Sequence, residues 1–396
     1  RQLGLQFSTV DNFFSQHYVK HTMTTRSGLS YQPVNLGSMT QVDAINLHED
    51  FSAPAQLRKA MWVDSLSKKQ IAQWWHKTDK DAETIRKSWE RFIGDRLSNA
   101  RKDDYKNEGC EDGAKNNIYF LRSYNHSSTS NGCPGRLYCH TSLQSLPRPI
   151  RNLLIEDVCS DIDMVNAAPT ILCYLAKKYE IDHLQLKSYR DNRESWFRQA
   201  SMDYGWTKRF CKDFVIRHMF NAKPDDRCKN KEFRGLVLQI YNIKKQLYKV
   251  PELSWVLQHC TMENPLGTFL KTIIFAIEAK LTSECVKYAQ SSLGWKIQAI
   301  VHDGFNPIGK FTDADTEPLE DFEYIGNQLF PGLDLKWAWK EFDMYFYDKK
   351  TGEKLPDQND PERRPKEFRP PADWLPKEEE EVNEDDYESD DDDFEG

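Results

Sequence analysis

Two aspartates separated by one residue occur in the segment 160–169, which reads Ser-Asp-Ile-Asp-Met-Val-Asn-Ala-Ala-Pro. Side chains alternate between the two faces of a β-strand, so Asp161 and Asp163 would share one face of a strand here. Adjacent carboxylates repel each other unless a cation lies between them. Mg²⁺ suits such a pair, because it accepts one or two carboxylates and fills its octahedron with water and substrate phosphates. An ordinary strand end with a helix-capping aspartate is the alternative explanation of this spacing.

Another aspartate lies in the sequence Val-His-Asp-Gly-Phe at residues 301–305. Asp-Gly is a strong signal for a two-residue hairpin turn, because a type I′ turn needs positive φ at both central positions. Ile297, Ala299 and Val301 alternate with other side chains on the way in, as in a strand. We therefore expect Asp303 at the apex of a tight hairpin, with its carboxylate free to face a cleft. A plain surface turn is the simpler alternative.

A basic helix is expected between these acidic segments. Lys208, Lys212, Val215 and Met219 are spaced so that they share one helix face. Two lysines in the first turns oppose the helix macrodipole, which costs stability unless an anion is bound there. A triphosphate would supply that anion, with the two amines ~6 Å apart along the axis. A solvent-facing basic helix is the alternative. In combination, two carboxylate sites and a cationic helix are the equipment for nucleotidyl transfer by two metal ions.

These residues must be positioned by a small set of elements. The patterns predict a strand at 158–165, a helix that opens at Pro169, helices at 206–220 and 264–290, and a hairpin at 295–305. Further upstream, a short strand is expected at 118–121. An amphipathic stripe predicts a helix within residues 55–105; its members are Ile85, Trp89, Phe92, Ile93 and Leu97.

Length and composition limit the remaining choices. The 396 residues allow two domains, or one large domain with an appendage, and a hydrophobic content of 39% excludes wholesale disorder. The longest apolar run, 273–277, is far shorter than the ~18 residues that cross a bilayer. With no signal-peptide pattern and nine scattered cysteines, an intracellular, reducing location is expected.

Charge is distributed unevenly along the chain. The net charge is −8, but 13 acidic residues and no basic ones lie in 378–396, so the rest of the chain is mildly basic. A basic body is compatible with a polyanionic partner. Six prolines lie in 356–376, so we expect residues 351–396 to form a proline-rich linker and an acidic, disordered tail.

The order of these motifs resembles the palm and fingers of family A DNA polymerases, and most of all their divergent viral and transposon-encoded branch. The resemblance covers roughly residues 130–345. The matching positions in chain order are Gly135-Arg136-Leu137, Leu143-Gln144-Ser145-Leu146-Pro147 with Arg151 after it, Asp163 with Asn166, Lys208 and Lys212 with Phe220 and Asn221, Asn264-Pro265-Leu266-Gly267-Thr268, and His302-Asp303.

The resemblance implies a role for each matched residue. Asp163 and Asp303 would hold two Mg²⁺ ions, with Mn²⁺ as a substitute and Asp161 as an accessory ligand. The incoming nucleotide would be bound by the helix positions Lys208, Lys212, Ile216 and Phe220, and Lys212 would also act in catalysis by gripping the phosphates. The primer–template would be contacted by Arg136, Gln144, Arg151 and His302.

The same resemblance implies the fold and the partners. The expected fold is α+β, a right-hand polymerase with an antiparallel palm sheet and helical fingers and thumb. Residues 1–125 would be an N-terminal region with a thumb-like helical element, 126–350 the palm and fingers, and about 178–260 the fingers. The partners would be a primer–template and nucleoside triphosphates, with no membrane. A superfamily 3 helicase is a further implied partner, and a viral protein would work in the host nucleus or cytoplasm.

Several positions depart from the family pattern, among them Gly304, Ala168, and Lys208 and Phe220, which stand where the family has Arg and Tyr. Gly304 replaces the second carboxylate of the last motif, so the metal ions would depend mainly on Asp163 and Asp303. Ala168 lies where these enzymes often have a glutamate that excludes ribonucleotides. The resulting hypothesis is a DNA-directed DNA polymerase without proofreading. The alternatives are a metal-dependent nuclease and a non-catalytic nucleic-acid-binding subunit of a replication complex.

Overall fold

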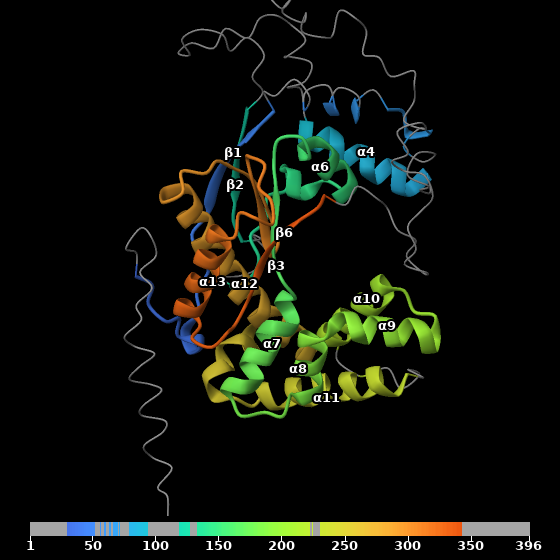
Figure 1. Ribbon diagram of the computed structural model, residues 1–396, viewed down its shortest axis with the longest axis vertical. Coiled ribbons are helices and arrows are strands. Elements are labelled where there is room, and N and C mark those ends of the chain that lie inside the picture. The colour runs from blue at the N-terminus through green and yellow to red at the C-terminus, as the bar shows by residue number, and fades with distance from the viewer. Residues whose placement is uncertain are drawn as a thin grey trace, which may run out of the picture.

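The computed structural model describes residues 30–51, 79–93, 119–126, 133–221 and 230–342, together with residue 224 and isolated positions between 56 and 71. The expected tail at 351–396 and most of the expected thumb-like segment lie outside these residues. The described chain is a mixed α and β structure in which all strand pairs are antiparallel (Figure 1).

A four-stranded sheet forms the centre of the molecule. Its strand order is β4-β5-β3-β6, with β3 at Asp161–Met164, β4 at Ile297–Val301, β5 at Gly304–Pro307 and β6 at Trp337–Lys340. The predicted strand and hairpin are confirmed, although β3 is shorter than the 158–165 expected from the sequence. The side chains of Ile162 and Met164 enter the core, which leaves the two aspartates of β3 on the opposite face.

A second, smaller sheet pairs β1 (Ile45–Asp50) with β2 (Tyr119–Tyr124). Three helical elements lie with it in Figure 1: α4 (Asp79–Ile93), the short 3-10 helix η3 (Leu143–Ser145) and α6 (Arg148–Ile155). The apolar side chains of these three helical elements form a hydrophobic core separate from the main one. This core takes residues from both sides of position 125, including Trp89 and Phe92 from α4 and Ile150 and Leu154 from α6.

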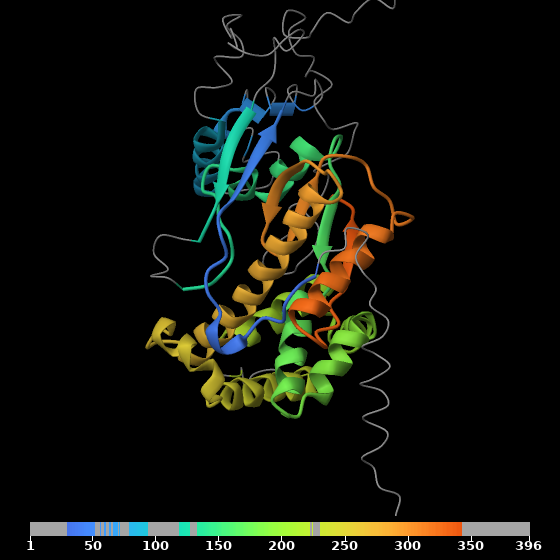
Figure 2. The ribbon, with the colours of Figure 1, turned by 90° about the vertical axis from the view of Figure 1, so that its left-hand side faces the viewer.

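Helices cover the other end of the central sheet. They are α7 (Ala167–Lys178), α8 (Leu184–Asp191), α9 (Arg193–Tyr204), α10 (Lys208–Phe220), α11 (Lys231–Leu247) and α12 (Pro265–Ser291), with α13 (Glu317–Leu329) beside the sheet and 3-10 helices η1 (Leu36–Ser38) and η4 (Pro251–His259). The predicted helices at 206–220 and 264–290 are confirmed as α10 and α12. Figure 2 shows the long helix α12, in yellow to orange, running from the sheets to this helical end.

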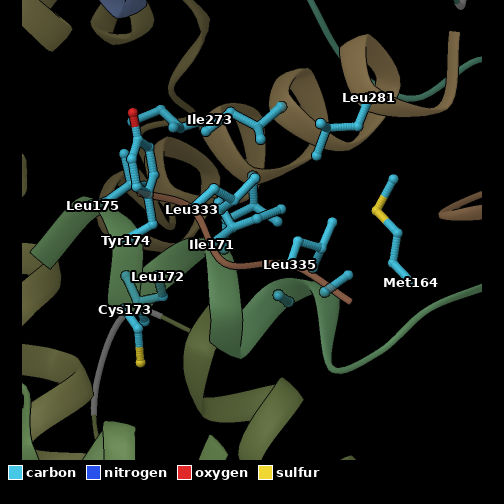
Figure 3. Close-up of a cluster of buried hydrophobic side chains, with 14 of the residues drawn as sticks. Met164, Ile171, Leu172, Cys173, Tyr174, Leu175, Ile273, Leu281, Leu333 and Leu335 are labelled. Carbon is cyan, nitrogen blue, oxygen red and sulfur yellow. The ribbon is translucent and has the colours of Figure 1, made fainter. Parts of the chain in front are cut away.

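Helix α7 begins directly after β3 and anchors it. The sequence pattern predicts a helix that begins at Pro169, but α7 begins two residues earlier, so Pro169 is its third residue. Proline is tolerated there because it is still in the first turn. Nearly every side chain of α7 is buried, and Ile171 packs with Leu281 of α12 and Leu333 (Figure 3). Burial all around α7 fixes the position of the preceding strand.

Among the described helices, even the 27-residue α12 lacks an apolar stretch of the kind that crosses a lipid bilayer.

Candidate active site

The central sheet brings together two acidic segments that are far apart in the sequence. Asp163 on β3 pairs with Gly304 on β5, and the backbone N–H of Met164 donates a hydrogen bond of 3.1 Å to the carbonyl oxygen of Asp303. Asp161 lies on the same face of β3 as Asp163. The strand pairing therefore brings together the three aspartates singled out in the sequence. Asp161 and Asp163 lie on one face of β3, and Asp303 lies in the loop of the adjacent β4–β5 hairpin.

The carboxylate of Asp163 is incompletely neutralised. Its Oδ1 atom is buried and has no hydrogen-bond partner, while Oδ2 forms an ion pair with the ammonium of Lys340. Burial and, after it, the negative charge of Asp303 raise the pKa of Asp163 to about 7, although Lys340 opposes the rise. A buried carboxylate oxygen without a partner costs free energy, and repulsion from a second carboxylate adds to that cost. A cation bound here would remove both costs.

Asp161 is in a better satisfied environment. The side-chain N–H of Asn306 on β5 donates a 2.9 Å hydrogen bond to its Oδ1 atom. Burial raises the pKa of Asp161, but the positive charges of Lys340 and Arg151 oppose that rise. The guanidinium of Arg151, on α6, is itself buried and its pKa falls to about 10. Arg151 thus lies within electrostatic range of the acidic face.

The turn that carries Asp303 differs from the one expected from Asp-Gly. The positive φ of 58° belongs to His302, and Gly304 already begins β5, so the loop consists of His302 and Asp303. Gly304 is required for another reason. A Cβ atom there would lie 2.3 Å from the carbonyl oxygen of Ile162 and 2.9 Å from Oδ1 of Asp163. The close approach of β5 to β3 therefore leaves no room for a second carboxylate at position 304.

Helix α10 carries the basic residues predicted to bind phosphates. The side chain of Thr207 caps its N-terminus by accepting a 3.1 Å hydrogen bond from the N–H of Phe210. Lys208 forms a 2.7 Å ion pair with Glu194, and both side chains are largely exposed. Within the described part of the chain, Lys212 has no ion-pair partner. Burial and, after it, the charges of Arg193, Lys208 and Lys340 lower the pKa of Lys212 to about 8.

The C-terminal end of α10 is fixed to the rest of the fold. Lys244 is buried and donates a 2.9 Å hydrogen bond to the carbonyl oxygen of His218. Asn264 donates one of 2.8 Å to the carbonyl oxygen of Phe220, whose ring contacts Phe275 of α12. The structure therefore places Phe220 against α12, whereas Ile216 lies on the exposed side of α10, 39% accessible.

Three of the residues predicted to contact a duplex, Arg136, Gln144 and His302, make contacts within the protein. Arg136 forms a 2.7 Å ion pair with Glu278 of α12, and its guanidinium stacks on the ring of Phe275. Gln144 holds its own loop, since its side chain bonds to Cys139 N and Leu137 O at 3.0 Å each. The ring of His302 contacts Tyr138, and burial lowers the pKa of His302 to about 4.

Two charged residues of this site were missed by the sequence reasoning. Glu278 is fully buried, its Oε1 atom has no partner, and burial raises its pKa to about 7, with the charges of Asp303 and Asp163 adding to the rise. Lys340 contacts Asp163 from the adjacent strand β6. Neither residue belongs to a motif. A glutamate in the apolar run of α12 is the one signal in the sequence that could have drawn attention to Glu278.

The donor set suits a divalent cation that keeps part of its water shell. Among the described residues, no cluster of three or more histidine, cysteine or acidic side chains is arranged as a complete metal cage. Mg²⁺ does not need one, since one or two carboxylates plus water and phosphate oxygens complete its coordination. The unpartnered Oδ1 atom of Asp163, beside the charge of Asp303, fits that requirement.

Comparison with known proteins yields weak similarity to solved structures. No family model and no curated protein sequence matches this chain. Among solved structures, it is similar to the POL domain of Pol1 from M. smegmatis in complex with DNA primer-template and dNTP. The sequence identity is 12%, the TM-score is 0.33, and the match covers 67% of this chain and 52% of that chain. The chain thus spans about half of that domain, and similarity at this level assigns neither fold nor function.

Proposed function

We propose that the protein is a template-directed nucleic-acid polymerase, most simply a DNA-directed DNA polymerase without proofreading. One observation carries the proposal: Asp163, beside the negative charge of Asp303, pairs with Lys340, and the charge of Lys340 in turn lowers the pKa of Lys212 on helix α10, which has no ion-pair partner among the described residues. Carboxylates hold the ions of two-metal nucleotidyl transfer, and a nearby ammonium neutralises the triphosphate.

The proposed roles follow from charge and position. Asp163 and Asp303 hold two Mg²⁺ ions, or Mn²⁺ in their place, with Asp161 in support. When bound, such ions activate the primer 3′-hydroxyl and stabilise the leaving pyrophosphate. Lys212 binds the phosphates of the nucleotide and Lys208 assists it.

The remaining contacts are proposed from the resemblance in the sequence. Ile216 and Phe220 pack against the nucleotide, and the primer–template is bound by Arg136, Gln144, Arg151 and His302. A right-hand arrangement, membership of the divergent viral or transposon-encoded branch of family A, and an intracellular site of action belong to the same proposal. A superfamily 3 helicase is a proposed partner on the resemblance alone.

A metal-dependent nuclease is the second candidate, because paired carboxylates serve it equally well. A nuclease has no use for a cationic helix placed to bind a triphosphate, so α10 favours the polymerase. A non-catalytic nucleic-acid-binding subunit is the third candidate, and the glycine at position 304 is the feature that favours it.

A labelled primer–template incubated with Mg²⁺, with and without nucleotides, separates the three candidates. A polymerase lengthens the primer only with nucleotides, a nuclease shortens it in both reactions, and a binding subunit leaves it unchanged. We expect lengthening, and a loss of at least about 10²–10³-fold in rate for Asp163→Ala and for Asp303→Ala. Duplex binding, measured by fluorescence anisotropy, should persist in both variants.

Asp203→Ala is the matched control, because Asp203 is an exposed acid on α9 whose side chain accepts a hydrogen bond from Gln199 of the same helix. It should retain the parental rate. Extension at that rate by either Asp163→Ala or Asp303→Ala would show that the carboxylate assignment is wrong.

A further inference from the structure

Lys340 lies at the centre of the acidic face although no motif includes it. Strand β6 runs antiparallel to β3, with Lys340 directly opposite Asp161. From this position its ammonium pairs with the Oδ2 atom of Asp163. The side chain of Lys340 is still 41% exposed, whereas that of Asp163 is 22% exposed. The lysine thus reaches the acidic centre from the solvent side, at the free edge of the sheet.

The ion pair satisfies only half of the Asp163 carboxylate. Oδ1 stays buried without a partner, and Asp303 remains as a second negative charge nearby. Ion pairs with a partly exposed lysine contribute little to stability, about 0–1 kcal/mol. A divalent cation between the two carboxylates would satisfy both of them, and it would repel the ammonium of Lys340. The contact is therefore one that a divalent cation can displace.

A released Lys340 would have a second anionic partner available. The charge of Lys340 lowers the pKa of Lys212 on α10, so the two ammonium groups lie within electrostatic range of each other across the space between β6 and α10. Two like charges held near each other favour an anion between them. The phosphates of a nucleotide that bind Lys212 would lie in that space.

We propose that Lys340 exchanges partners during nucleotide binding: it neutralises Asp163 while no divalent cation is bound, and binds the triphosphate beside Lys212 once a cation displaces it. This inference rests on the proposed polymerase function. It adds to that function a third phosphate-binding residue, supplied by the palm-like sheet. A lysine that only braced the edge of the sheet would leave the affinity for metal ions unchanged.

The test measures Mn²⁺ binding to the nucleotide-free protein by titration calorimetry and by the electron paramagnetic resonance signal of free Mn²⁺. Lys340→Met removes the competing ammonium, so we expect Mn²⁺ to bind about threefold to tenfold more tightly. At saturating Mn²⁺, the same variant should bind a non-hydrolysable nucleoside triphosphate more weakly by a similar factor. Lys340→Arg, which keeps the charge, should stay close to the parental protein in both measurements.

Lys336→Met is the matched control. Lys336 lies just before β6 and forms a 2.6 Å ion pair with Glu323, away from the acidic face. It should change neither affinity. Unchanged or weaker Mn²⁺ binding by Lys340→Met would overturn the partner exchange. If the parental protein extends primers and Lys340→Met behaves as the control does, only the inference fails. If the parental protein binds no Mn²⁺, the proposed function fails with it.

Discussion

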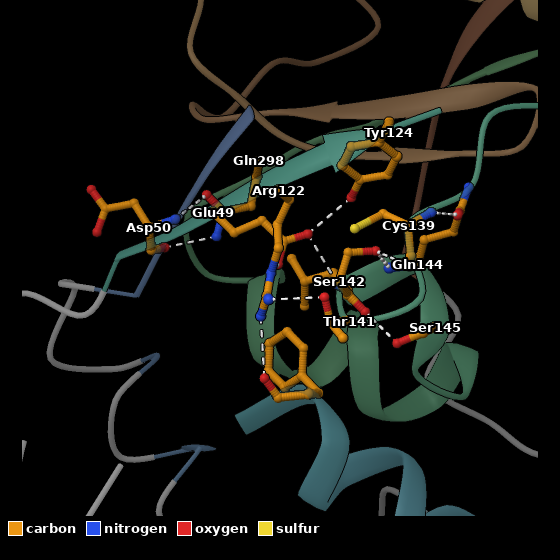
Figure 4. A network of polar contacts seen from close by, with 12 residues as sticks. Glu49, Asp50, Arg122, Tyr124, Cys139, Thr141, Ser142, Gln144, Ser145 and Gln298 are labelled. Atoms are coloured by element: carbon orange, nitrogen blue, oxygen red, sulfur yellow. Dashed lines mark hydrogen bonds and ion pairs between the residues drawn. The ribbon is translucent and has the colours of Figure 1, made fainter. Parts of the chain in front are cut away.

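Two acidic residues of this protein, the buried Glu49 and the partly buried Asp163, have opposite surroundings. Both oxygens of Glu49 are bonded: Oε2 to Arg122 Nε at 3.2 Å, and Oε1 to the Tyr124 hydroxyl at 2.9 Å and the backbone N–H of Leu143 at 3.0 Å (Figure 4). Burial raises the pKa of Glu49 and outweighs these partners, every one of which lowers it, so that the pKa is about 7.

The Asp163 carboxylate has the reverse arrangement. One oxygen is unpartnered, the other pairs with the half-exposed Lys340, and the charges of Asp303 and Asp161 raise the pKa in the same direction as burial does. Buried polar groups in native proteins are nearly always satisfied, so an unsatisfied one indicates strain, a catalytic role or an absent ion.

The comparison distinguishes polar groups that stabilise the fold from polar groups that are available to a ligand. The Glu49 network joins elements that lie far apart in sequence, since Arg122 also bonds to the carbonyl oxygen of Phe92 on α4 and to the hydroxyl of Thr141. The polar groups of this network form the hydrogen bonds that hold β1, β2, α4 and the 139–145 loop together. The group around Asp163 contributes less to holding the fold and leaves its charge available to a ligand.

The two regions are mechanically connected. The Gln298 side chain on β4 exchanges two hydrogen bonds with the backbone of Asp50 on β1, at 3.1 and 2.7 Å. β4 leads directly into the loop that carries Asp303. The satisfied network therefore supports the strand that positions the unsatisfied site.

The largest expected effect contrasts the two acids directly. Glu49→Gln removes the carboxylate that pairs with the buried guanidinium of Arg122, so we expect a loss of about 3–5 kcal/mol in the free energy of unfolding. Asp163→Asn relieves repulsion from Asp303 and should keep or raise stability. Urea denaturation of both variants near pH ~8 measures the difference. Equal losses in the two variants would mean that the contrast between the regions does not exist.

A smaller change in the free energy of unfolding is expected when the pH is varied. The folded-state pKa of Asp163, about 7, exceeds the ~3.9 of an unfolded aspartate, so the folded state binds the proton more tightly. Stability should therefore fall as pH rises through this window, and Asp163→Asn should make the fall shallower. Glu49, whose pKa is also raised to about 7, contributes to the same slope.

The effect of Mg²⁺ on stability distinguishes the contribution of Asp163 from that of Glu49. Because it binds only the folded site, Mg²⁺ should stabilise the parental protein more at about pH 8 than at about pH 5. Glu49→Gln should retain this effect and Asp163→Asn should lose it, as thermal melting with and without Mg²⁺ would show. A Mg²⁺ effect that survives Asp163→Asn would place the ion elsewhere.

The smallest effect concerns the surface pair between Lys208 and Glu194, which represents a third situation, satisfied but exposed. With side chains 56% and 62% exposed, this pair should contribute less than ~1 kcal/mol, so Glu194→Gln should unfold at nearly the parental urea concentration. A larger loss would show that the pair is shielded from solvent, and Lys208 would then be less available to a nucleotide.

Local patterns predicted much of the fold. The alternation before Asp303 gave a hairpin, and the spacing of Lys208 and Lys212 gave a helix; the structure has both. The predicted position of the turn was wrong by one residue. Asp-Gly predicts a loop formed by Asp303 and Gly304, but Val301 pairs with Gly304, so the loop consists of His302 and Asp303. Register depends on the partner strand, which a local pattern does not contain.

The sequence by itself determined which side chains share a strand or helix face, because the periods of these elements are fixed by backbone geometry. It therefore placed Asp161 beside Asp163 and Lys208 beside Lys212. Only the tertiary structure decided that β6 brings Lys340 to Asp163, that α12 brings Glu278 to Arg136, and that one aspartate of β3 is satisfied and the other is not. Those outcomes depend on contacts between residues more than a hundred positions apart, which are set by the packing of whole elements.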